Sequence, residues 1–184
     1  MKHEPIPGTF IIGIGHKARH GKDTAANHII KQTHGAAERY SFADDLYSVA
    51  RVIHGMTKKD GPLLQLLGTE VYRRYNDGVW IDSLYWKLLD KRPRIALIAD
   101  VRFPNEAKFV KALGGALVKV SRFNEDDTPF ITTDRDPNHP SEVALDNFDG
   151  WDYNIKSYTG QLPTLLLNVD NLLWDLRDRI GTDF

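Results

Sequence analysis

The sequence predicts an α/β domain in which a parallel β-sheet carries helices on both faces. Short apolar runs of strand length alternate with segments whose apolar residues recur at helical spacing, which is typical of this class. The clearest strands are continuous apolar runs, as expected of strands buried on both sides. The length of 184 residues suits one domain, because a chain of that size can bury a core without disulfides or a structural metal. We therefore expect a single domain over 1–184.

The first half of the chain contains two expected strands and four expected helices. The first strand runs into a basic loop that contains Gly15 and Gly21. Pro62 suits the start of the third helix, because its missing N–H would be unpaired there in any residue. A turn signal at 76–78 separates the last two helices. The expected elements are strands at 9–14 and 37–41 and helices at 22–33, 44–54, 61–75 and 80–90.

The second half alternates in the same way, apart from one irregular segment. A continuous apolar strand is ended by Asp100, and the C-terminal helix carries a long stripe of leucines. The segment 124–152 is irregular, contains three prolines and is strongly acidic. The expected elements are strands at 94–99, 116–120 and 153–156 and helices at 105–113 and 162–180.

The composition excludes several classes of protein and of site. The chain has no cysteine, which excludes disulfide scaffolds, thiolate zinc sites and cysteine nucleophiles. The net charge of −1 gives no global argument for a nucleic-acid polymer or a membrane as partner. No run approaches the roughly 18 apolar residues of a membrane-spanning helix, and 1–8 lacks the apolar part of a signal peptide. We therefore expect a soluble, cytoplasmic protein.

The loop between the first strand and the first helix has the composition of a phosphate-binding loop. Loop amides and a helix N-terminus converge on phosphate oxygens in such a loop, and Lys22 would neutralise the β- and γ-phosphates of a nucleotide. Lys17 and Arg19 add positive potential. The expected nucleotide-binding residues are Gly15, His16, Lys17, Ala18, Arg19, Gly21, Lys22, Asp23 and Thr24.

This loop departs twice from the standard pattern G-x(4)-G-K-[ST]. His16 stands where the first glycine should be, and Asp23 replaces the hydroxyl residue that contacts Mg²⁺, with Thr24 one place later. Asp23 could contact the ion directly or through water, because Mg²⁺ favours carboxylate and water oxygens. The alternative is a basic loop before a helix with no ligand.

Four segments in a fixed order resemble the deoxynucleoside monophosphate kinases of bacteriophages and their relatives. The resemblance runs from Phe10 to about the end of the chain, and that family also has Asp after the loop lysine and a loop without its first glycine. The segments are Gly21–Ala26, Tyr40–Asp44, Leu66–Glu70 with Arg73, and Asp100–Glu106.

The resemblance implies a P-loop NTPase fold with a helical substrate-binding insertion and a lid. The core would be about 9–60 and 93–184, the acceptor-binding helices about 61–92 and the lid about 122–150. The reaction implied is the transfer of a phosphoryl group from ATP, with Mg²⁺, to a deoxynucleoside monophosphate (dNMP). The resemblance places the protein in the host cytoplasm if a phage encodes it, and leaves a homodimer open.

Asp100 and Arg102 lie where an α/β sheet presents ligands, at the carboxyl ends of its strands. Asp100 could hold Mg²⁺ or its waters together with Asp23 and Thr24, and its alternative is to cap the helix 105–113. Arg102 is a candidate phosphate contact, and its alternative is an ion pair with Glu106.

Arginines are the expected contacts of the acceptor and transferring phosphates, because a guanidinium binds phosphate through two parallel hydrogen bonds. Arg73 and Arg74 point about 100° apart on a helix, so one of them is expected to face the site, and the resemblance favours Arg73. Arg122 and Arg135 are the candidates for a lid that closes over the transferring group. A solvated basic face remains the alternative for Arg73 and Arg74.

The remaining candidates concern the sugar and base of the acceptor. Asp44 could accept a hydrogen bond from the sugar or a metal-bound water, and capping the following helix is an equal alternative. Gln65, Glu70, Tyr72 and Trp80 are further candidates, although aromatic residues in a leucine-rich helix more often belong to the core. His139 lies in a segment that also resembles the family, without a clear role.

We therefore expect an ATP-dependent dNMP kinase in which Lys22, Arg73, Arg122, Arg135 and Asp100 are catalytic. The alternatives are another small-molecule P-loop kinase, such as one acting on dephospho-coenzyme A, and a nucleotide-binding module without activity. The net charge of −1 is the sum of two parts of opposite sign, because the segment 124–152 carries −8 and the remainder of the chain +7. A positive body suits a protein that holds two anionic nucleotides.

Overall fold

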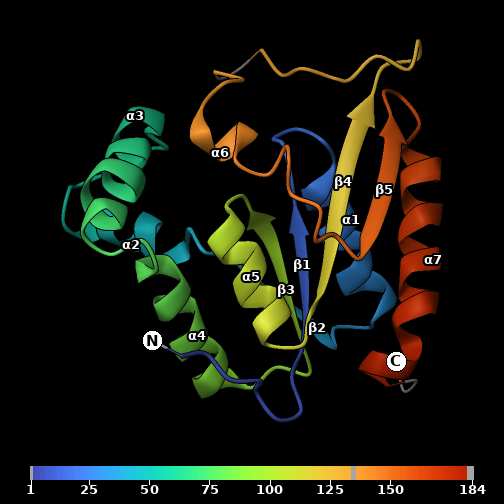
Figure 1. Cartoon of the computed structure of the whole chain (residues 1–184), viewed down its shortest axis with the longest axis horizontal. Helices are drawn as coiled ribbons and strands as arrows, with labels where there is room; N and C mark the ends of the chain where they lie inside the picture. Colours follow the sequence, from blue (N-terminus) through green and yellow to red (C-terminus); the bar gives the residue numbers. More distant parts are fainter. Residues whose placement is uncertain (1, 134–135, 182–184) are drawn as a thin grey trace.

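The protein folds around a five-stranded parallel sheet, in the order β2-β3-β1-β4-β5 (Figure 1). The computed structural model describes residues 2–133 and 136–181. The α/β parallel sheet expected from the sequence is confirmed. The strands are β1 (Phe10–Gly15), β2 (Ala37–Tyr40), β3 (Ile95–Val101), β4 (Ala116–Phe123) and β5 (Tyr153–Tyr158).

Helices cover both faces of this sheet, as predicted (Figure 1). Helices α1 (Lys22–Gln32) and α7 (Leu162–Ile180) cover one face, and α4 (Val79–Lys91) and α5 (Pro104–Ala112) cover the other. The side chains of β1 alternate between the two cores, with Ile12 in the first and Ile11 in the second, because successive strand residues point to opposite faces. No helix in the described ranges is long and apolar enough to cross a membrane.

A helical projection extends beyond the sheet, at the left of Figure 1. It consists of α2 (Asp44–Val52), α3 (Gly61–Gln65) and a π-helix, η1 (Leu66–Arg73). A small core of its own holds it together, formed by Ala50, Met56, Leu64 and Leu67. The single helix expected over 61–75 is therefore wrong in detail, because the backbone widens to π-helical hydrogen bonding after Gln65.

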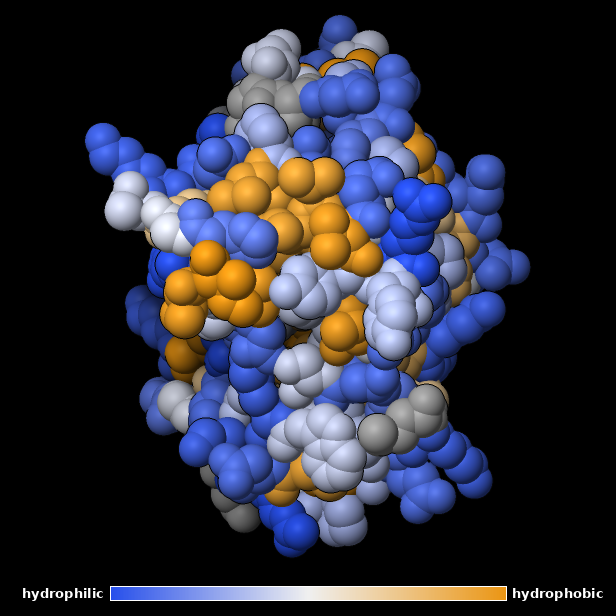
Figure 2. Space-filling view, turned by 90° about the vertical axis from the view of Figure 1, so that its left-hand side faces the viewer, coloured by the Kyte–Doolittle hydropathy of each residue, from blue (hydrophilic) through white to orange (hydrophobic). Residues whose placement is uncertain are grey.

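The helical projection also leaves apolar side chains exposed. Figure 2 shows apolar side chains gathered on the face at the left of Figure 1. Exposed large apolar residues of α2, η1 and the residue after α2 are Val52, Ile53, Leu66 and Val71. The wall of this projection that faces the sheet is the part that contributes to the site.

Three strands are longer than the sequence pattern predicted, among them β5, which continues to Tyr158 rather than ending at Lys156. Strand β3 includes Asp100, and β4 continues to Phe123, so Arg122 lies on a strand rather than on a loop. The irregular segment 124–152 contains one short helix, α6 (Pro140–Val143), among its described residues.

The strand order fixes where a ligand can bind. Strand β1 lies at the centre, with β3 on one side and β4 on the other. In an open α/β sheet, ligands bind outside the carboxyl ends of the strands at the point where the strand order reverses. That point is the loop after β1, which is the basic loop singled out in the sequence.

Candidate active site

The loop 15–21 is bent so that its backbone can face a bound anion. His16, Arg19 and Gly21 have left-handed φ angles of 89°, 61° and 96°, and such turns form concave nests of N–H groups. The loop ends directly at the N-terminus of α1, whose dipole also favours an anion. The geometry is that of a phosphate-binding loop, although His16 replaces its first glycine.

Gly15 allows the loop to leave the sheet at this point. A Cβ atom on Gly15 would lie 2.7 Å from the carbonyl oxygen of Val101 and 2.6 Å from the indole ring of Trp151. Gly15 therefore serves the close packing of the loop against β3 and Trp151.

Lys22 is the buried cation of the loop. Its side chain is enclosed at the first position of α1, and its ammonium group donates a hydrogen bond to the Lys17 carbonyl oxygen. Burial lowers the pKa of Lys22 to about 8, and the neighbouring Arg102 lowers it further, whereas the carboxylates of Glu142, Asp23 and Asp100 oppose the shift. A phosphate beside Lys22 would supply the negative charge that favours the ammonium form.

Two cavities meet at this loop. The small cavity, about 350 Å³, lies between the loop, Arg122 and the turn from β5 to α7. The large cavity, about 840 Å³, lies between the loop, the carboxyl end of β3 and the helical projection. Arg19, Lys22 and Asp23 line both cavities. One cationic loop therefore faces two separate spaces.

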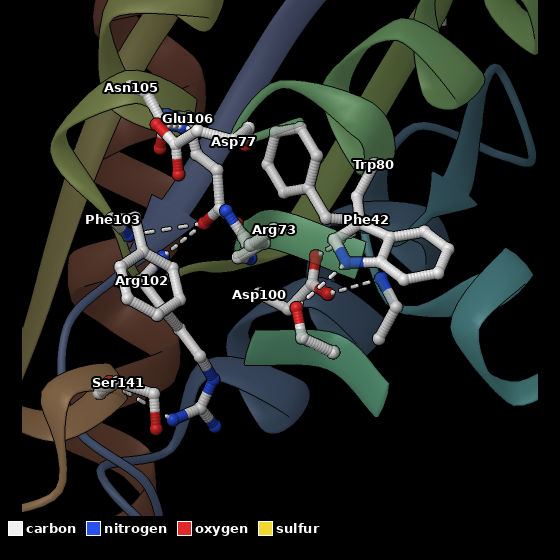
Figure 3. A network of polar contacts seen from close by, with 12 residues as sticks. Phe42, Arg73, Asp77, Trp80, Asp100, Arg102, Phe103, Asn105, Glu106 and Ser141 are labelled. Atoms are coloured by element: carbon white, nitrogen blue, oxygen red, sulfur yellow. Dashed lines mark hydrogen bonds and ion pairs between the residues drawn. The ribbon is translucent and has the colours of Figure 1, made fainter. Parts of the chain in front are cut away.

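Arg73 lines the large cavity on the side opposite the loop. Its Nη2 donates to Glu106 Oε1 at 2.5 Å, and its guanidinium lies over the Phe103 ring, 4.4 Å from the centroid (Figure 3). Its Nη1 is buried and has no hydrogen-bond partner in the described part of the chain. A buried donor without a partner is costly, and an anion in the cavity would satisfy it.

Glu106 is the buried carboxylate that holds this wall together. Its Oε2 accepts the backbone N–H groups of Arg102 at 2.7 Å and Phe103 at 3.1 Å, while Oε1 accepts from Arg73. Burial raises the pKa of Glu106 to about 7, and the positive charge of Arg73 opposes that shift. The alternative that Arg102 forms an ion pair with Glu106 is wrong, because Glu106 binds the Arg102 backbone and the Arg73 side chain.

Asp100 anchors the loop between β2 and α2. Its Oδ2 accepts from Ser41 Oγ at 2.6 Å and from the Ala43 N–H at 3.1 Å, and its Oδ1 accepts the Phe42 N–H at 3.1 Å (Figure 3). The alternative that Asp100 caps α5 is wrong, because the residue before that helix is Phe103. Asp100 lines the large cavity at the carboxyl end of β3.

The acidic segment binds the phosphate-binding loop through two carboxylates. Glu142 is buried, accepts the Ala18 N–H at 2.7 Å and pairs with Arg102 Nη1 at 2.5 Å. Asp146 accepts from Lys17 Nζ at 2.9 Å and contacts His16 Nε2 at 3.2 Å. The acidic segment therefore packs on the basic loop, a contact that the sequence did not predict.

His20 and Arg122 connect the loop to β4. The Arg122 N–H donates to His20 Nδ1 at 3.1 Å, and His20 Nε2 donates to the Phe130 carbonyl at 3.2 Å. The Arg122 side chain donates to Thr159 Oγ1 at 3.1 Å and to the Arg19 carbonyl at 3.3 Å. Arg122 therefore lines the small cavity from a fixed strand.

The structure brings most of the predicted site residues to the two cavities. Gln65 and the buried Trp80, whose Nε1 donates to the Gly68 carbonyl at 3.2 Å, are on the wall of the large cavity. Predicted residues that line a cavity are Ala18, Arg19, Gly21, Lys22, Asp23, Thr24, Gln65, Arg73, Trp80, Asp100, Arg102 and Arg122.

The other predicted residues lie away from the cavity walls. Asp44 is the first residue of α2 and accepts from the Ser41 N–H at 3.2 Å, so the alternative that its side chain caps this helix is wrong. Arg74 and Glu70 are exposed. Arg135 lies outside the described residues. The residues that line neither cavity are Gly15, His16, Lys17, Asp44, Glu70, Tyr72 and Arg74.

Sequence reasoning missed several residues of the site. Glu142 was counted only in the negative charge of the segment 124–152, and Glu106 only as an alternative ion-pair partner of Arg102. Arg39 of β2 pairs with Asp23 and lines the large cavity. His139, which the sequence singled out without a role, lines the same cavity. Glu106 could have been found from its position three residues after Phe103, which is where a carboxylate reaches back to the start of a helix.

Comparisons with known proteins agree with this geometry. The chain is 31% identical over 174 residues to a protein of Acanthamoeba polyphaga mimivirus with the curated name "Putative deoxynucleotide monophosphate kinase", and the match covers 77% of this chain and 85% of the relative. The fold of this chain is similar to that of a shikimate kinase from Acinetobacter baumannii solved in complex with shikimate. The TM-score is 0.50, the match covers 97% of each chain, and the sequence identity is 16%. No protein-family model matches the chain.

Proposed function

The chain belongs to the deoxynucleotide monophosphate kinase family, and we propose that it transfers the γ-phosphoryl group of ATP to a deoxynucleoside monophosphate. The observation that carries this proposal is one cationic loop shared by two cavities. A donor nucleotide in the small cavity and an acceptor in the large cavity would meet at Lys22. An enzyme that hydrolysed a single nucleotide would not need the second cavity.

Each cavity carries arginines suited to a phosphate. Arg122 lines the small cavity, and Arg73 lines the large cavity and has a buried N–H that lacks a partner in the described part of the chain. The two arginines come from β4 and η1, on opposite sides of the loop. This arrangement supports Arg73 as the contact of the acceptor phosphate and Arg122 as a contact of the donor or of the transferring group. The role of Arg135 stays a prediction.

The proposed reaction requires positioning and charge neutralisation. An oxygen of the acceptor phosphate attacks the γ-phosphorus, the new P–O bond forms, and the bond to the β-phosphate oxygen breaks so that ADP leaves. No general base is needed, because a phosphate monoester with a second pKa of about 6 is mostly ionised at pH 7. Lys22 and the loop amides hold the donor phosphates, and Arg73 fixes the attacking oxygen in line.

The residues near the loop fit a hydrated Mg²⁺ ion. Among the described residues, no cluster of three or more acidic or histidine side chains could hold a metal alone, so phosphate oxygens would have to supply ligands. Asp23 and Thr24 line the small cavity, and Asp100 Oδ1 accepts only one of the hydrogen bonds described above. These oxygens would hold the ion or its waters, and the ion would neutralise charge on the transferring group.

The substrate proposal is tested by measuring ADP release from ATP with dAMP, dCMP, dGMP and dTMP, using the four ribonucleotides for comparison. We expect turnover with at least one dNMP and weaker turnover with its ribonucleotide. Turnover only with a non-nucleotide acceptor, such as dephospho-coenzyme A, would contradict the proposal. ATP binding without any turnover would indicate a nucleotide-binding module. Homodimer formation stays a separate prediction, to be measured by analytical ultracentrifugation.

The assignment of the loop is tested by Lys22→Ala. Because Lys22 is the buried cation between the two cavities, its removal should lower kcat by a factor of about 10² or more, the usual effect of removing one charge-stabilising donor. Lys31→Ala is the matched control, because Lys31 is exposed in the last turn of the same helix. Equal activity of the Lys22→Ala and Lys31→Ala variants would refute the assignment.

A further inference from the structure

The wall of the large cavity contains a buried ion pair whose arginine has one spare donor. Arg73 gives Nη2 to Glu106 and stacks on Phe103, while Nη1 is buried with no partner in the described part of the chain. Both side chains of the pair are enclosed, with 11% of Arg73 and 2% of Glu106 exposed. The guanidinium is therefore fixed in direction before any ligand arrives.

Glu106 has a second set of contacts that fixes its own position. Its Oε2 accepts two backbone N–H groups at the start of α5, so the carboxylate cannot turn without giving up both. One of these two N–H groups is that of Arg102, whose side chain lines the large cavity and pairs with Glu142. One carboxylate thus fixes the direction of Arg73 and the backbone that carries Arg102.

We infer that Glu106 is a positioning residue for the acceptor phosphate, acting through Arg73. The inference rests on the proposed function, because it assigns the large cavity to the acceptor. An arginine with one amino group on a carboxylate and the other unpartnered presents an N–H to an anion in a fixed orientation, and a phosphate monoester fits that donor. Without Glu106, Arg73 would be free to turn away from the cavity.

Glu106→Gln separates positioning from folding. The glutamine oxygen can still accept the Arg102 and Phe103 N–H groups, whereas its NH₂ group would face the Arg73 guanidinium and could not accept from it. We expect kcat/KM for the dNMP to fall at least tenfold while KM for ATP changes less than twofold. Glu125→Gln, an exposed residue of the segment 124–128, is the matched control and should match the wild type.

A double-mutant comparison checks that the effect passes through Arg73. On an Arg73→Lys background, Glu106→Gln should lower kcat/KM for the dNMP by less than twofold, because the guanidinium that Glu106 positions is already absent. A merely structural Glu106 would instead change KM for ATP as well, and its effect would multiply with that of Arg73→Lys. Either of those results would overturn the inference.

The experiment distinguishes failure of the inference from failure of the proposed function. A wild-type protein that turns over no dNMP contradicts the proposed function and the inference with it. An active wild type with an unchanged Glu106→Gln variant contradicts the inference alone. Circular dichroism checks folding. If Glu106→Gln does not fold, Glu106→Asp serves, because it keeps the charge but is too short to reach Arg73 and both amides, and the same selective loss is expected.

Discussion

His20 is a buried histidine whose neutral form the fold requires. It accepts the Arg122 N–H through Nδ1, so protonation at that atom would break the hydrogen bond. Burial, the largest cause, together with Lys22 and Lys17, lowers the pKa of His20 to about 4, while the Phe130 carbonyl and Glu142 oppose the shift. Between pH 6.5 and about 4 the unfolded chain therefore binds more protons than the folded one. Stability is lost as the pH falls through this range.

We expect the free energy of unfolding to fall by about 2 kcal/mol more between pH 7 and pH 5 in the wild type than in His20→Asn. Asparagine offers an oxygen near the position of Nδ1 but does not titrate. Urea denaturation at the two pH values measures the difference. His16 has its pKa lowered in the same direction and is present in both proteins, so it cancels. Equal pH dependence in both proteins would show that His20 does not contribute.

At the level of single residues, the sequence predicted which residue types form the site but not their partners. Lys22 and Asp100 could be placed because each stands at the end of an apolar strand or at the start of a helix. The choice between Arg73 and Arg74 could not be made from periodicity, since it depends on the position of Glu106, 33 residues away from Arg73. Glu142 is 124 residues from Ala18, and no local pattern links the two.

The elements follow the sequence more closely than the individual contacts do. Every strand was expected, because runs such as 94–99 are continuously apolar. The ends of the strands were predicted less accurately. Strand β4 continues through Ser121, Arg122 and Phe123 because it pairs with β5 over this length. The π-helix η1 was not foreseen, since its apolar residues also fit an ordinary helix. Pairing and helix widening are decided by neighbours in space, which a local pattern does not contain.

The close packing at the end of β1 predicts that Gly15 cannot be replaced by a larger residue without loss of stability. A methyl group there would meet the Val101 carbonyl oxygen and the Trp151 ring, and a backbone atom cannot move away as a flexible side chain can. We expect Gly15→Ala to lower the free energy of unfolding by about 1–3 kcal/mol, the usual cost of overpacking, and to weaken ATP binding because the loop follows directly. Chemical denaturation and calorimetric titration with ATP measure the two effects.

Gly61→Ala provides the control for this prediction. Gly61 is the first residue of α3, its φ angle is not left-handed, and a Cβ atom there would meet nothing within 4 Å. The Gly61→Ala variant should match the wild type in stability and ATP binding. If Gly15→Ala behaved in the same way, the close approach of β1, β3 and Trp151 would not constrain the loop.

On the scale of the whole molecule, the division of charge becomes a contact between two parts of the chain. The segment 124–152 carries −8 and the rest +7, and Glu142 and Asp146 bring the two together at the phosphate-binding loop. The carboxylates therefore occupy donors that a nucleotide phosphate could also use. Asp146 is more than one-third exposed, whereas Glu142 is buried. Replacing Asp146 should therefore destabilise the fold less than replacing Glu142.

Asp146→Asn should strengthen ATP binding by about twofold to fivefold, the range expected of one exposed ion pair. The substitution frees Lys17 from its ion pair and makes the loop more positive. The gain should shrink when the salt concentration rises from 50 to 300 mM, because exposed charges are screened within a shorter distance at higher salt. Calorimetric titration with ATP at both salt concentrations measures this.

Asp149→Asn separates the ion pair from the overall charge of the segment. Asp149 is an exposed aspartate of the same acidic segment, so the variant changes the net charge equally without touching Lys17. If the pair with Lys17 is responsible, Asp149→Asn should change ATP affinity by less than half as much as Asp146→Asn. Equal gains in the two variants would mean that the acidic segment acts on the loop through its total charge, and that the contact at Lys17 adds nothing of its own.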